Sequence, residues 1–293
     1  MTSLADALAR GPVILDGGLG TLLESEGHDL SSDLWSARLL VENPAAIRHA
    51  HEQYFAAGAQ VAITSSYQVS FEGLARRGIV GADAERVLRL SVQLATDARP
   101  DGDRWVAASV GPYGAMLADG SEYRGDYGLS AEQLRAWHRP RMRVLADSGA
   151  DVLAIETIPC LAEVQAVLAE LHDTRHPGWL AVTAAHGTLR SGESLTEAYA
   201  LADEVDEIVA MGINCADPYD VAAAIDAARS VTAKPLVVYP NSGERWDTKN
   251  HAWIGEPGFP DSLVRGWIDA GARLVGGCCR VAPEQIRRIA ALT

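Results

Sequence analysis

The stretch GADVLAIET at residues 149–157 joins the end of a helical pattern to a short apolar run, and two other parts of the chain repeat this junction. They are GAQVAIT at 58–64 and GARLVGG at 271–277. In each one a glycine and an alanine precede one polar residue and then a mostly β-branched or apolar run, which is typical of a helix that ends just before a buried strand. The recurrence indicates copies of one supersecondary unit.

Eight apolar runs of this kind alternate with amphipathic stretches along the 293 residues. Continuous apolar runs are expected for strands that are covered on both faces, as in a parallel sheet. The alternation predicts a (β/α)8 TIM barrel of the α/β class, with residues 1–293 as a single domain. A doubly wound open sheet is the alternative. The runs lie at 13–18, 61–67, 105–112, 152–157, 179–184, 207–215, 235–241 and 272–279.

Helix-start signals fall between these runs. Ser130 is a good N-cap, and Pro283 suits a first helical turn. Asn43-Pro44 and Asp217-Pro218 combine a capping side chain with a proline, so each predicts a helix that begins there.

Two long segments, 19–43 and 113–130, follow predicted strands rather than helices. Both are therefore expected at the C-terminal mouth of the barrel, where the active sites of such barrels are built. Connections of this length in a compact fold are usually functional lids or binding loops.

Composition narrows the function classes. The formal net charge is −14 and the pI is near 5.0, which disfavours binding to nucleic acid or to an anionic membrane. The first residues show no secretory signal pattern, and no run of about 18 apolar residues is present. We expect a cytoplasmic enzyme that acts on small molecules.

Three of the four cysteines lie at predicted strand ends. Cys215 ends the sixth run, and Cys278 and Cys279 end the eighth, so their sulfurs are expected to converge at the barrel rim. Three thiolates with one open position describe a catalytic zinc site, because the fourth position is left for substrate. The alternatives are a redox pair or chance, and Cys160 is interpreted as a small buried hydrophobe.

Seven motifs then make the chain resemble the homocysteine S-methyltransferase family, and most closely its branch that uses S-methylmethionine or S-adenosylmethionine. The resemblance covers essentially the whole chain, in order, and implies the same barrel with the three cysteines as zinc ligands. It implies methyl transfer to the thiol of homocysteine. The motifs are LDGGLGT, LWSARLLVENP, AGAQVAITSSYQ, GSEYRGDYG, GINC, VVYPNSGE and GARLVGGCCR.

The same resemblance assigns the ammonium of homocysteine to Asp16 and Glu156, which end the first and fourth runs. A buried ion pair is the structural alternative for either residue. The backbone amides of Gly17 and Gly18 are candidates for the substrate carboxylate. Weaker candidates for homocysteine binding are Ser66 and Asn214, each of which is equally suited to a structural hydrogen bond.

The donor carries a sulfonium cation, and aromatic faces attract such cations. The aromatic residues of the two long segments are therefore candidates, Arg124 is suited to a carboxylate, and Asp126 is suited to an ammonium. The alternative is a loop that packs on itself. The aromatic candidates are Trp35, Tyr113, Tyr123 and Tyr127.

Two departures from the family leave the donor open between S-methylmethionine and S-adenosylmethionine. The segment AAHGTLRSGESL after the fifth run is shorter than usual and carries Ser191-Gly192-Glu193, and the opening motif GGLGT has small residues. Betaine is disfavoured, because that branch carries a C-terminal extension that is missing here.

Two rival functions come from other classes. A zinc hydrolase would gather histidines at strand ends, yet no run ends in histidine, and we expect His49 and His51 to lie on different faces of a solvated helix. The other rival is a non-catalytic zinc or redox thiol protein built on Cys278-Cys279.

Overall fold

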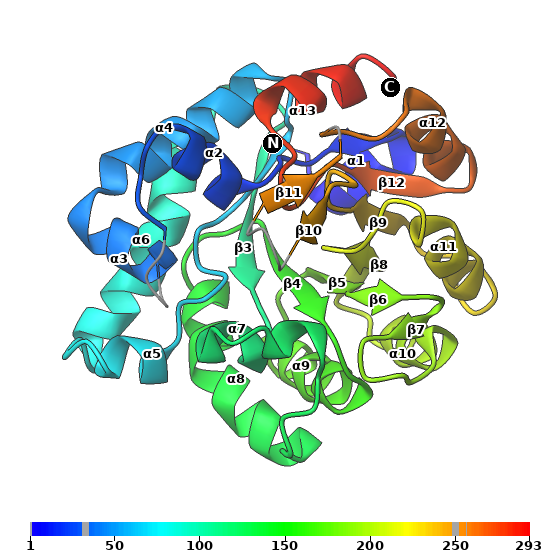
Figure 1. The fold of residues 1–293 in the computed structure, drawn as a ribbon. Helices are drawn as coiled ribbons and strands as arrows, with labels where there is room; N and C mark the ends of the chain where they lie inside the picture. Colours follow the sequence, from blue (N-terminus) through cyan, green and yellow to red (C-terminus); the bar gives the residue numbers. More distant parts are fainter. Residues whose placement is uncertain (1, 31–34, 248–251, 256) are drawn as a thin grey trace.

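Eight parallel strands surround the centre of the molecule, and helices lie outside them (Figure 1). The computed structural model describes residues 2–30, 35–247, 252–255 and 257–293. Each of the eight predicted apolar runs overlaps one of these strands, and β4 and β5 each extend one residue beyond their run. In sheet order they are β1 (Val13–Ile14), β12 (Ala272–Val275), β9 (Leu236–Tyr239), β8 (Ile208–Asn214), β5 (Gly178–Val182), β4 (Val152–Ile158), β3 (Trp105–Val110) and β2 (Val61–Ile63).

The sheet closes on itself between β1 and β2. Leu15 and Val61 form a parallel bridge, and the Asp16 amide donates to the Val61 carbonyl at 3.1 Å. The Gln60 amide donates to the Ile14 carbonyl at 2.7 Å. The open-sheet alternative is therefore excluded, and the predicted (β/α)8 TIM barrel is confirmed.

Apolar side chains fill two layers, one inside the barrel and one between the strands and the helices. The inner layer includes Leu15, Val61, Trp105 and Trp179, all buried. Helix α1 (Leu4–Arg10) packs on this inner layer through Leu4, Ala7 and Leu8. The outer layer is formed with the helices α4 (Pro44–Ala56), α5 (Phe71–Ala75), α6 (Ala82–Ala98), α8 (Ala131–Ala146), α9 (Leu161–Thr174), α10 (Leu195–Asp203), α11 (Val221–Arg229), α12 (Asp261–Asp269) and α13 (Pro283–Ala290).

Three of the predicted helix starts are confirmed. Asn43 caps α4, Ser130 forms a capping box at the start of α8, and Pro283 is the first residue of α13. The fourth start was placed too early. Asp217 instead begins a turn, because its carbonyl accepts from the Asp220 amide at 3.0 Å, and α11 begins only at Val221.

The two histidines of α4 do lie on different faces, but only one of them is solvated. His49 is exposed, whereas His51 is fully buried. Neither ring nitrogen of His51 has a hydrogen-bond partner among the described residues. The expectation of a solvated helix was therefore wrong for His51, because α4 turns that face towards the core.

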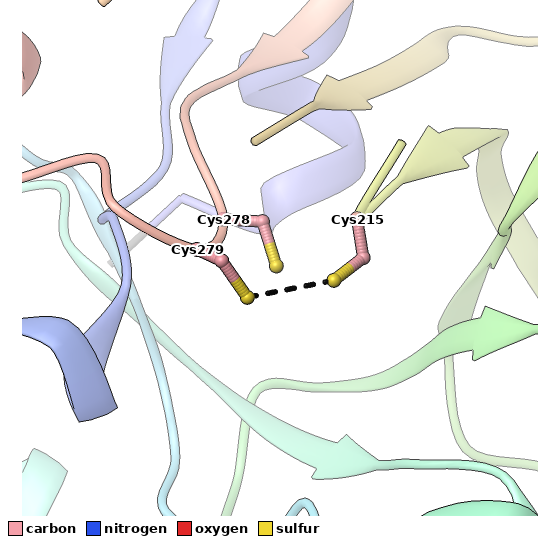
Figure 2. Close-up of side chains that lie close together, drawn as sticks. All are labelled: Cys215, Cys278 and Cys279. Carbon is pink, nitrogen blue, oxygen red and sulfur yellow. Dashed lines mark hydrogen bonds between the residues drawn. The ribbon is translucent and has the colours of Figure 1, made fainter. Parts of the chain in front are cut away.

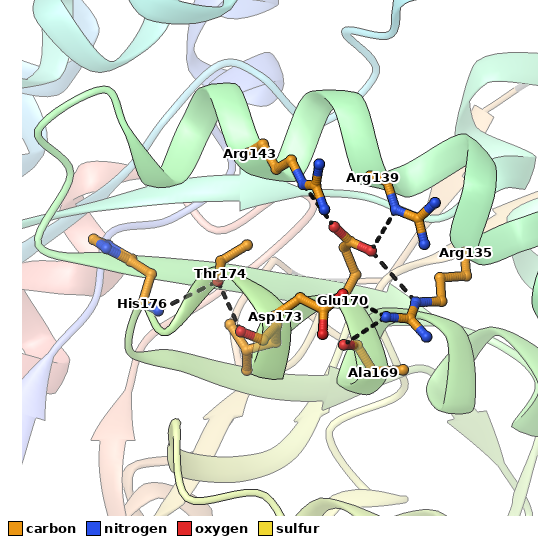
Figure 3. A network of polar contacts seen from close by, with 9 residues as sticks. Arg135, Arg139, Arg143, Ala169, Glu170, Asp173, Thr174 and His176 are labelled. Atoms are coloured by element: carbon orange, nitrogen blue, oxygen red, sulfur yellow. Dashed lines mark hydrogen bonds and ion pairs between the residues drawn. The ribbon is translucent and has the colours of Figure 1, made fainter.

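An ionic network joins α8 to α9 on the outside of the barrel (Figure 3). The carboxylate of the fully buried Glu170 on α9 lies 3.1–3.4 Å from guanidinium nitrogens of Arg135, Arg139 and Arg143. These arginines are spaced by four residues, so they form one stripe along α8. The network fixes the outer face of α8, and the opposite face of that helix is turned towards the strands.

Four excursions lie at the C-terminal ends of the strands. The two predicted segments carry short helices rather than plain loops, and two hairpins were not predicted. No helix in the described part of the chain is long and apolar enough to span a membrane. The excursions carry α2 (Leu19–Ser25), α3 (Trp35–Glu42), α7 (Tyr113–Leu117), the 3-10 turn η1 (Ser121–Tyr123), the hairpin β6 (Ala184–Ala185) with β7 (Thr188–Leu189), and the hairpin β10 (Arg245–Asp247) with β11 (Ala252–Ile254).

Candidate metal and substrate site

Three cysteine sulfurs meet at the barrel mouth (Figure 2). Cys215 follows β8, and Cys278 and Cys279 follow β12, on either side of β9. The Cys215 and Cys279 sulfurs are 3.7 Å apart, and all three sulfurs lie within 4.8 Å of one another. The predicted convergence of these three side chains is confirmed.

The backbone fixes each of these cysteines. The Cys215 amide donates to the Tyr239 carbonyl at 3.2 Å, and the Cys278 amide donates to the Pro240 carbonyl at 2.8 Å. The Cys279 amide donates to the Asn241 side chain at 3.1 Å. Cys215 also adopts a φ of 49°, a left-handed conformation that is costly for a residue with a Cβ atom. This turn is where the chain leaves the strand axis of β8.

Glycines allow the loops after β1 and β12 to pack on each other. A Cβ atom on Gly18 would lie 2.6 Å from the Cys278 carbonyl oxygen, and one on Gly277 would clash with the Val281 side chain. The Gly18 amide donates to the Val281 carbonyl at 2.9 Å. That amide is therefore already bonded in this structure, which leaves Gly17 as the simpler of the two candidates for the substrate carboxylate.

The sulfur cluster fits a tetrahedral metal ion. Zinc–sulfur bonds of about 2.3 Å at tetrahedral angles place two sulfurs about 3.8 Å apart, which is close to the Cys215–Cys279 separation of 3.7 Å. Without a metal, hydrogen bonds from Cys215 and Cys278 hold the pKa of Cys279 well below its usual value, and the pKa of Cys278 is raised. Cys215 is buried and Cys278 and Cys279 are half-buried, and three sulfurs this close need a cation before all of them can ionise.

Two buried carboxylates lie beside the cluster. Asp16 follows β1, and its Oδ2 accepts from the Ile63 amide at 2.8 Å, while Oδ1 has no hydrogen-bond partner among the described residues. Glu156 lies on β4 and accepts a short hydrogen bond from the Ser109 hydroxyl. Burial raises the pKa of Asp16 well above its usual value and that of Glu156 to about 7. Both groups are thus poised to gain from a cationic partner.

The weaker candidates lie behind this pair rather than in the cavity. The Ser66 hydroxyl donates to the Ser109 carbonyl at 2.7 Å. Asn214 accepts from the Thr157 amide at 2.7 Å and donates to the Thr157 hydroxyl at 2.8 Å. Asn214 therefore ties the residue after Glu156 to the residue before Cys215. The structure shows structural hydrogen bonds for both, and their substrate contacts stay predictions.

A cavity of about 280 Å³ contains the cluster and the two acids. Several of the residues that line it were not among the candidates named from the sequence. One of them, Glu122, lies within the GSEYRGDYG motif, so the sequence did contain a signal for it. Tyr67 and Thr157 are the last residues of the second and fourth predicted runs, and this position at a strand end was the signal available for them. The lining comprises Asp16, Gly17, Gly18, Leu19, Gly20, Thr21, Ile63, Thr64, Ser65, Tyr67, Gln68, Glu122, Tyr123, Glu156, Thr157, Cys215, Tyr239, Gly277, Cys278 and Cys279.

Of the donor candidates, Tyr123 reaches the cavity, and its hydroxyl lies 3.1 Å from the Cys215 sulfur. Tyr113 instead packs edge-on against Tyr127, with ring centroids 5.4 Å apart. Arg124 pairs with Asp126 at 3.4 Å, and both are exposed. These four residues do not line the cavity as it is described, so their contacts with a donor stay predictions.

The remaining donor candidate is Trp35. It is the first residue of α3, but its side chain lies outside the part of the structure that is described.

Comparison with known proteins gives one consistent answer. A family model described as homocysteine S-methyltransferase matches residues 13–293. The chain is 44% identical over 296 residues to homocysteine S-methyltransferase YbgG of Bacillus subtilis, covering 95% of this chain and 93% of that one. It is 43% identical over 305 residues to selenocysteine Se-methyltransferase of Brassica oleracea, covering 95% and 88%.

A solved structure shares both the fold and the sequence. The metallated form of the homocysteine methyltransferase MmuM from Escherichia coli superposes with a TM-score of 0.87 at 42% identity, covering 97% of this chain and 96% of that one. The family match over residues 13–293 and the identities to the named proteins indicate the same family. The chain belongs to the homocysteine S-methyltransferase family.

Proposed function

We propose that this homocysteine S-methyltransferase holds a zinc ion on Cys215, Cys278 and Cys279 and takes its methyl group from S-methylmethionine or S-adenosylmethionine. The observation that carries the proposal is the meeting of three sulfurs and two buried acids in one cavity. A zinc ion there would lower the pKa of a substrate thiol bound at its fourth position, so that the acceptor sulfur is a thiolate at neutral pH.

Asp16 and Glu156 are suited to hold the ammonium of homocysteine. Their carboxyl groups are buried, and Asp16 Oδ1 is without a partner among the described residues. An ammonium group would satisfy that oxygen and compensate both charges. Because Asp16 contacts the Ile63 amide and Glu156 contacts Ser109, each acid is held in place before substrate arrives. Such preorganisation lowers the entropic cost of binding.

The cavity also suits the charge change of the reaction. An anionic thiolate attacks the methyl carbon of a cationic sulfonium, and the carbon–sulfur bond to the donor breaks with its electron pair left on the donor sulfur. Charges are neutralised in this step, so a site from which water is excluded favours it. Tyr123 contributes by covering Cys215 from the side of residues 113–130.

The proposal for the donor rests on the GSEYRGDYG segment and its neighbours. Tyr123 from this segment faces the Arg190 guanidinium, which lies 5.6 Å from the ring centroid. Arg190 belongs to the shortened segment after β5, so that segment contacts the cavity wall without lining the cavity itself. The unusual Glu193 in the same segment accepts from the Leu161 amide at the start of α9. The departure after β5 is thus suited to alter donor fit more than metal binding.

The decisive assay follows methionine formation from homocysteine by zinc-loaded and by chelator-treated protein. S-methylmethionine, S-adenosylmethionine and betaine are supplied in separate reactions, and the metal of the purified protein is identified by element-specific mass spectrometry. Zinc-dependent turnover with a sulfonium donor is expected. Turnover that is unaffected by metal removal, or none with any donor despite bound zinc, would overturn the proposal.

A selenium acceptor is a second candidate substrate, because one relative is named for methylating selenocysteine. Selenolates parallel thiolates as soft nucleophiles and metal ligands. The same assay with selenohomocysteine and selenocysteine as acceptors tests this extension. A rate that does not exceed the uncatalysed background with either acceptor would exclude it.

A further inference from the structure

Acidic groups are the only charged side chains among the cavity residues that the structure describes. Three carboxylates, from Asp16, Glu156 and Glu122, share the cavity with the three cysteines, and no lysine, arginine or histidine lines it. Two of these acids stand on the barrel strands or directly after them. Glu122 comes instead from η1, in the segment that covers the mouth. The third acid therefore enters the cavity from another element than the other two.

The position of Glu122 is fixed by its own segment. A Cβ atom on Gly114 would clash with the Glu122 amide, so the glycine allows η1 to pack directly on α7. The Ser121 amide, one residue earlier, donates to Asp119 Oδ1 at 2.9 Å. The next residue, Tyr123, points its hydroxyl at Cys215. The Glu122 side chain is thereby held beside the sulfur cluster.

One of the two oxygens of the Glu122 carboxylate is unsatisfied. Its Oε2 is buried and accepts no hydrogen bond from any described residue. The nearest cation in the segment, Arg124, is engaged by Asp126 at 3.4 Å and by the Ser121 hydroxyl at 2.8 Å. Burial raises the pKa of Glu122, and the Arg124 charge lowers it less. A buried carboxylate oxygen without a partner is costly, so a bound cation would relieve that cost.

Two substrates bring cationic groups to this cavity, and each cationic group is matched by different acidic residues. The ammonium of homocysteine is matched by Asp16 and Glu156, whose elements lie on the barrel wall. The sulfonium donor must approach from the side that is still open, since its methyl group has to lie between its own sulfur and the acceptor sulfur. Glu122 lies on the segment that covers this side, next to Tyr123 and within electrostatic reach of Cys215.

We propose that the Glu122 carboxylate is the counter-charge of the cationic sulfonium donor, and that it selects donors by their positive charge. This inference rests on the proposed function. When the methyl carbon bonds to the acceptor sulfur and leaves the donor, the donor becomes a neutral thioether. The attraction between Glu122 and the donor sulfur is lost in the same step, so Glu122 holds the cationic donor more tightly than the spent donor.

The test compares Glu122→Gln with the wild type and with Glu132→Gln. Gln keeps the size of the side chain and removes its charge, and Glu132, exposed in the first turn of α8, undergoes the same chemical change away from the cavity. S-methylmethionine is titrated calorimetrically into each zinc-loaded protein, and KM is measured for donor and for homocysteine separately. Glu122→Asp is included, because it keeps the charge on a shorter side chain.

We expect Glu122→Gln to weaken S-methylmethionine binding and raise its KM by about tenfold, the scale of one charge-assisted contact. The KM for homocysteine should change less than twofold, Glu132→Gln should match the wild type, and Glu122→Asp should recover part of the affinity. Unchanged donor affinity in Glu122→Gln, or a loss of homocysteine affinity instead, would overturn the inference. A wild type inactive with every donor would overturn the proposed function itself. Calorimetry measures donor binding without turnover, so it would still show whether Glu122 contributes to that binding.

Discussion

The cysteine rim, which we define as residue 215 with residues 276–281, and the lid, residues 111–127, face the same cavity but are held in different ways. In the rim, backbone amides bond to neighbouring strands and loops: the amides of Gly276 and Gly277 donate to the carbonyls of Val238 and Asp16 at 3.0 and 3.1 Å. The barrel itself thus supplies the partners. Moving the rim would require breaking the ends of the strands.

The lid is held by side chains from the helices beneath it. Glu163 on α9 accepts from the Tyr113 amide at 2.6 Å and lies 2.8 Å from His138 on α8. Arg141, also on α8, donates to the Gly111 carbonyl at 2.6 Å. All three anchoring side chains are buried. The lid therefore depends on a small polar cluster that single substitutions can remove.

The contrast indicates that the rim and the lid have different roles, the rim in metal binding and the lid in donor binding. Backbone hydrogen bonds to the strand ends and to the loop after β9 hold the three cysteines, which suits a metal site whose geometry must be fixed. The lid carries Glu122 and Tyr123, and its anchors lie outside the cavity. Changes in the lid can therefore alter the donor without disturbing the metal.

The largest effect is expected from breaking the rim. Cys215→Ala, Cys278→Ala or Cys279→Ala leaves two sulfurs, and we expect each to abolish zinc retention and methyl transfer. Metal content after dialysis against a weak chelator is the measurement. Cys160→Ala is the matched control, since Cys160 is a buried free cysteine outside the cluster and should keep its metal. Full activity in any metal-depleted rim variant would contradict the assignment.

The next effect comes from releasing the lid. Glu163→Ala removes the acceptor of Tyr113 and leaves Arg141 as a buried cation with less compensation, so we expect a loss of about 3–5 kcal/mol in the free energy of unfolding. The KM for the donor should rise while metal content stays at the wild-type level. Urea unfolding and metal analysis measure both.

The control for the lid variant is Asp173→Ala, which removes a partly exposed ion pair with Arg135 on the outside of α8 and α9. Exposed pairs contribute little, so its stability should change by less than about 1 kcal/mol. If Glu163→Ala lost its metal together with its donor affinity, rim and lid would not be independent.

The rim residues were predictable from the sequence, whereas for the lid the sequence indicated its place at the mouth and Tyr123 but not the roles of Glu122 and Glu163. Buried parallel strands are recognised from their apolar runs, and residues towards the ends of such runs, such as Asp16 and Cys215, must lie at the mouth. Glu122 and Glu163 have no such rule. Their placement depends on contacts between segments far apart in the chain, including Tyr113 with Glu163, and local patterns do not encode those contacts.

The same reason explains the errors within regular elements. Helical spacing correctly separated His49 from His51, but it did not show that the face of His51 is covered. Asn214 was a candidate for substrate binding because it precedes Cys215, yet its side chain bonds to Thr157 on β4. The hairpin of β10 and β11 follows a strand whose apolar run was recognised. The residues of the hairpin itself showed no pattern from which it could be predicted.

A smaller effect is expected at the boundary between rim and barrel wall. Glu156→Ala should weaken homocysteine binding by about tenfold, the scale of one charge-assisted contact, with zinc still present. Its hydrogen bond to Ser109 shows that the carboxylate is held independently of the cysteines. Calorimetric titration of homocysteine into the zinc-loaded variant is the measurement. An unchanged affinity would assign Glu156 to structure.

The smallest effect concerns the scaffold under the rim. Helix α4 supports the rim through Tyr54, whose hydroxyl bonds to the carbonyls of Gly18 and Val281 at 3.0 Å. His51 lies one turn earlier on the same buried side, and burial lowers its pKa to about 4. Because the unfolded chain binds the proton near pH 6.5 and the folded one does not, stability is full above that pH and falls as pH decreases towards 4.

At pH 5.5 this difference in His51 protonation corresponds to about 1.4 kcal/mol of lost stability. His51→Leu, similar in volume, cannot take up the proton, so the gap in unfolding free energy between wild type and variant should shift by that amount between pH 7.5 and 5.5. The pKa values of His138 and His176 are also lowered by burial, so the wild type alone would not isolate His51. Urea titrations of both chelator-treated proteins at the two pH values measure the shift. A gap that stayed constant with pH would show that the folded protein protonates His51 as readily as the unfolded chain does, and would contradict the lowered pKa of His51.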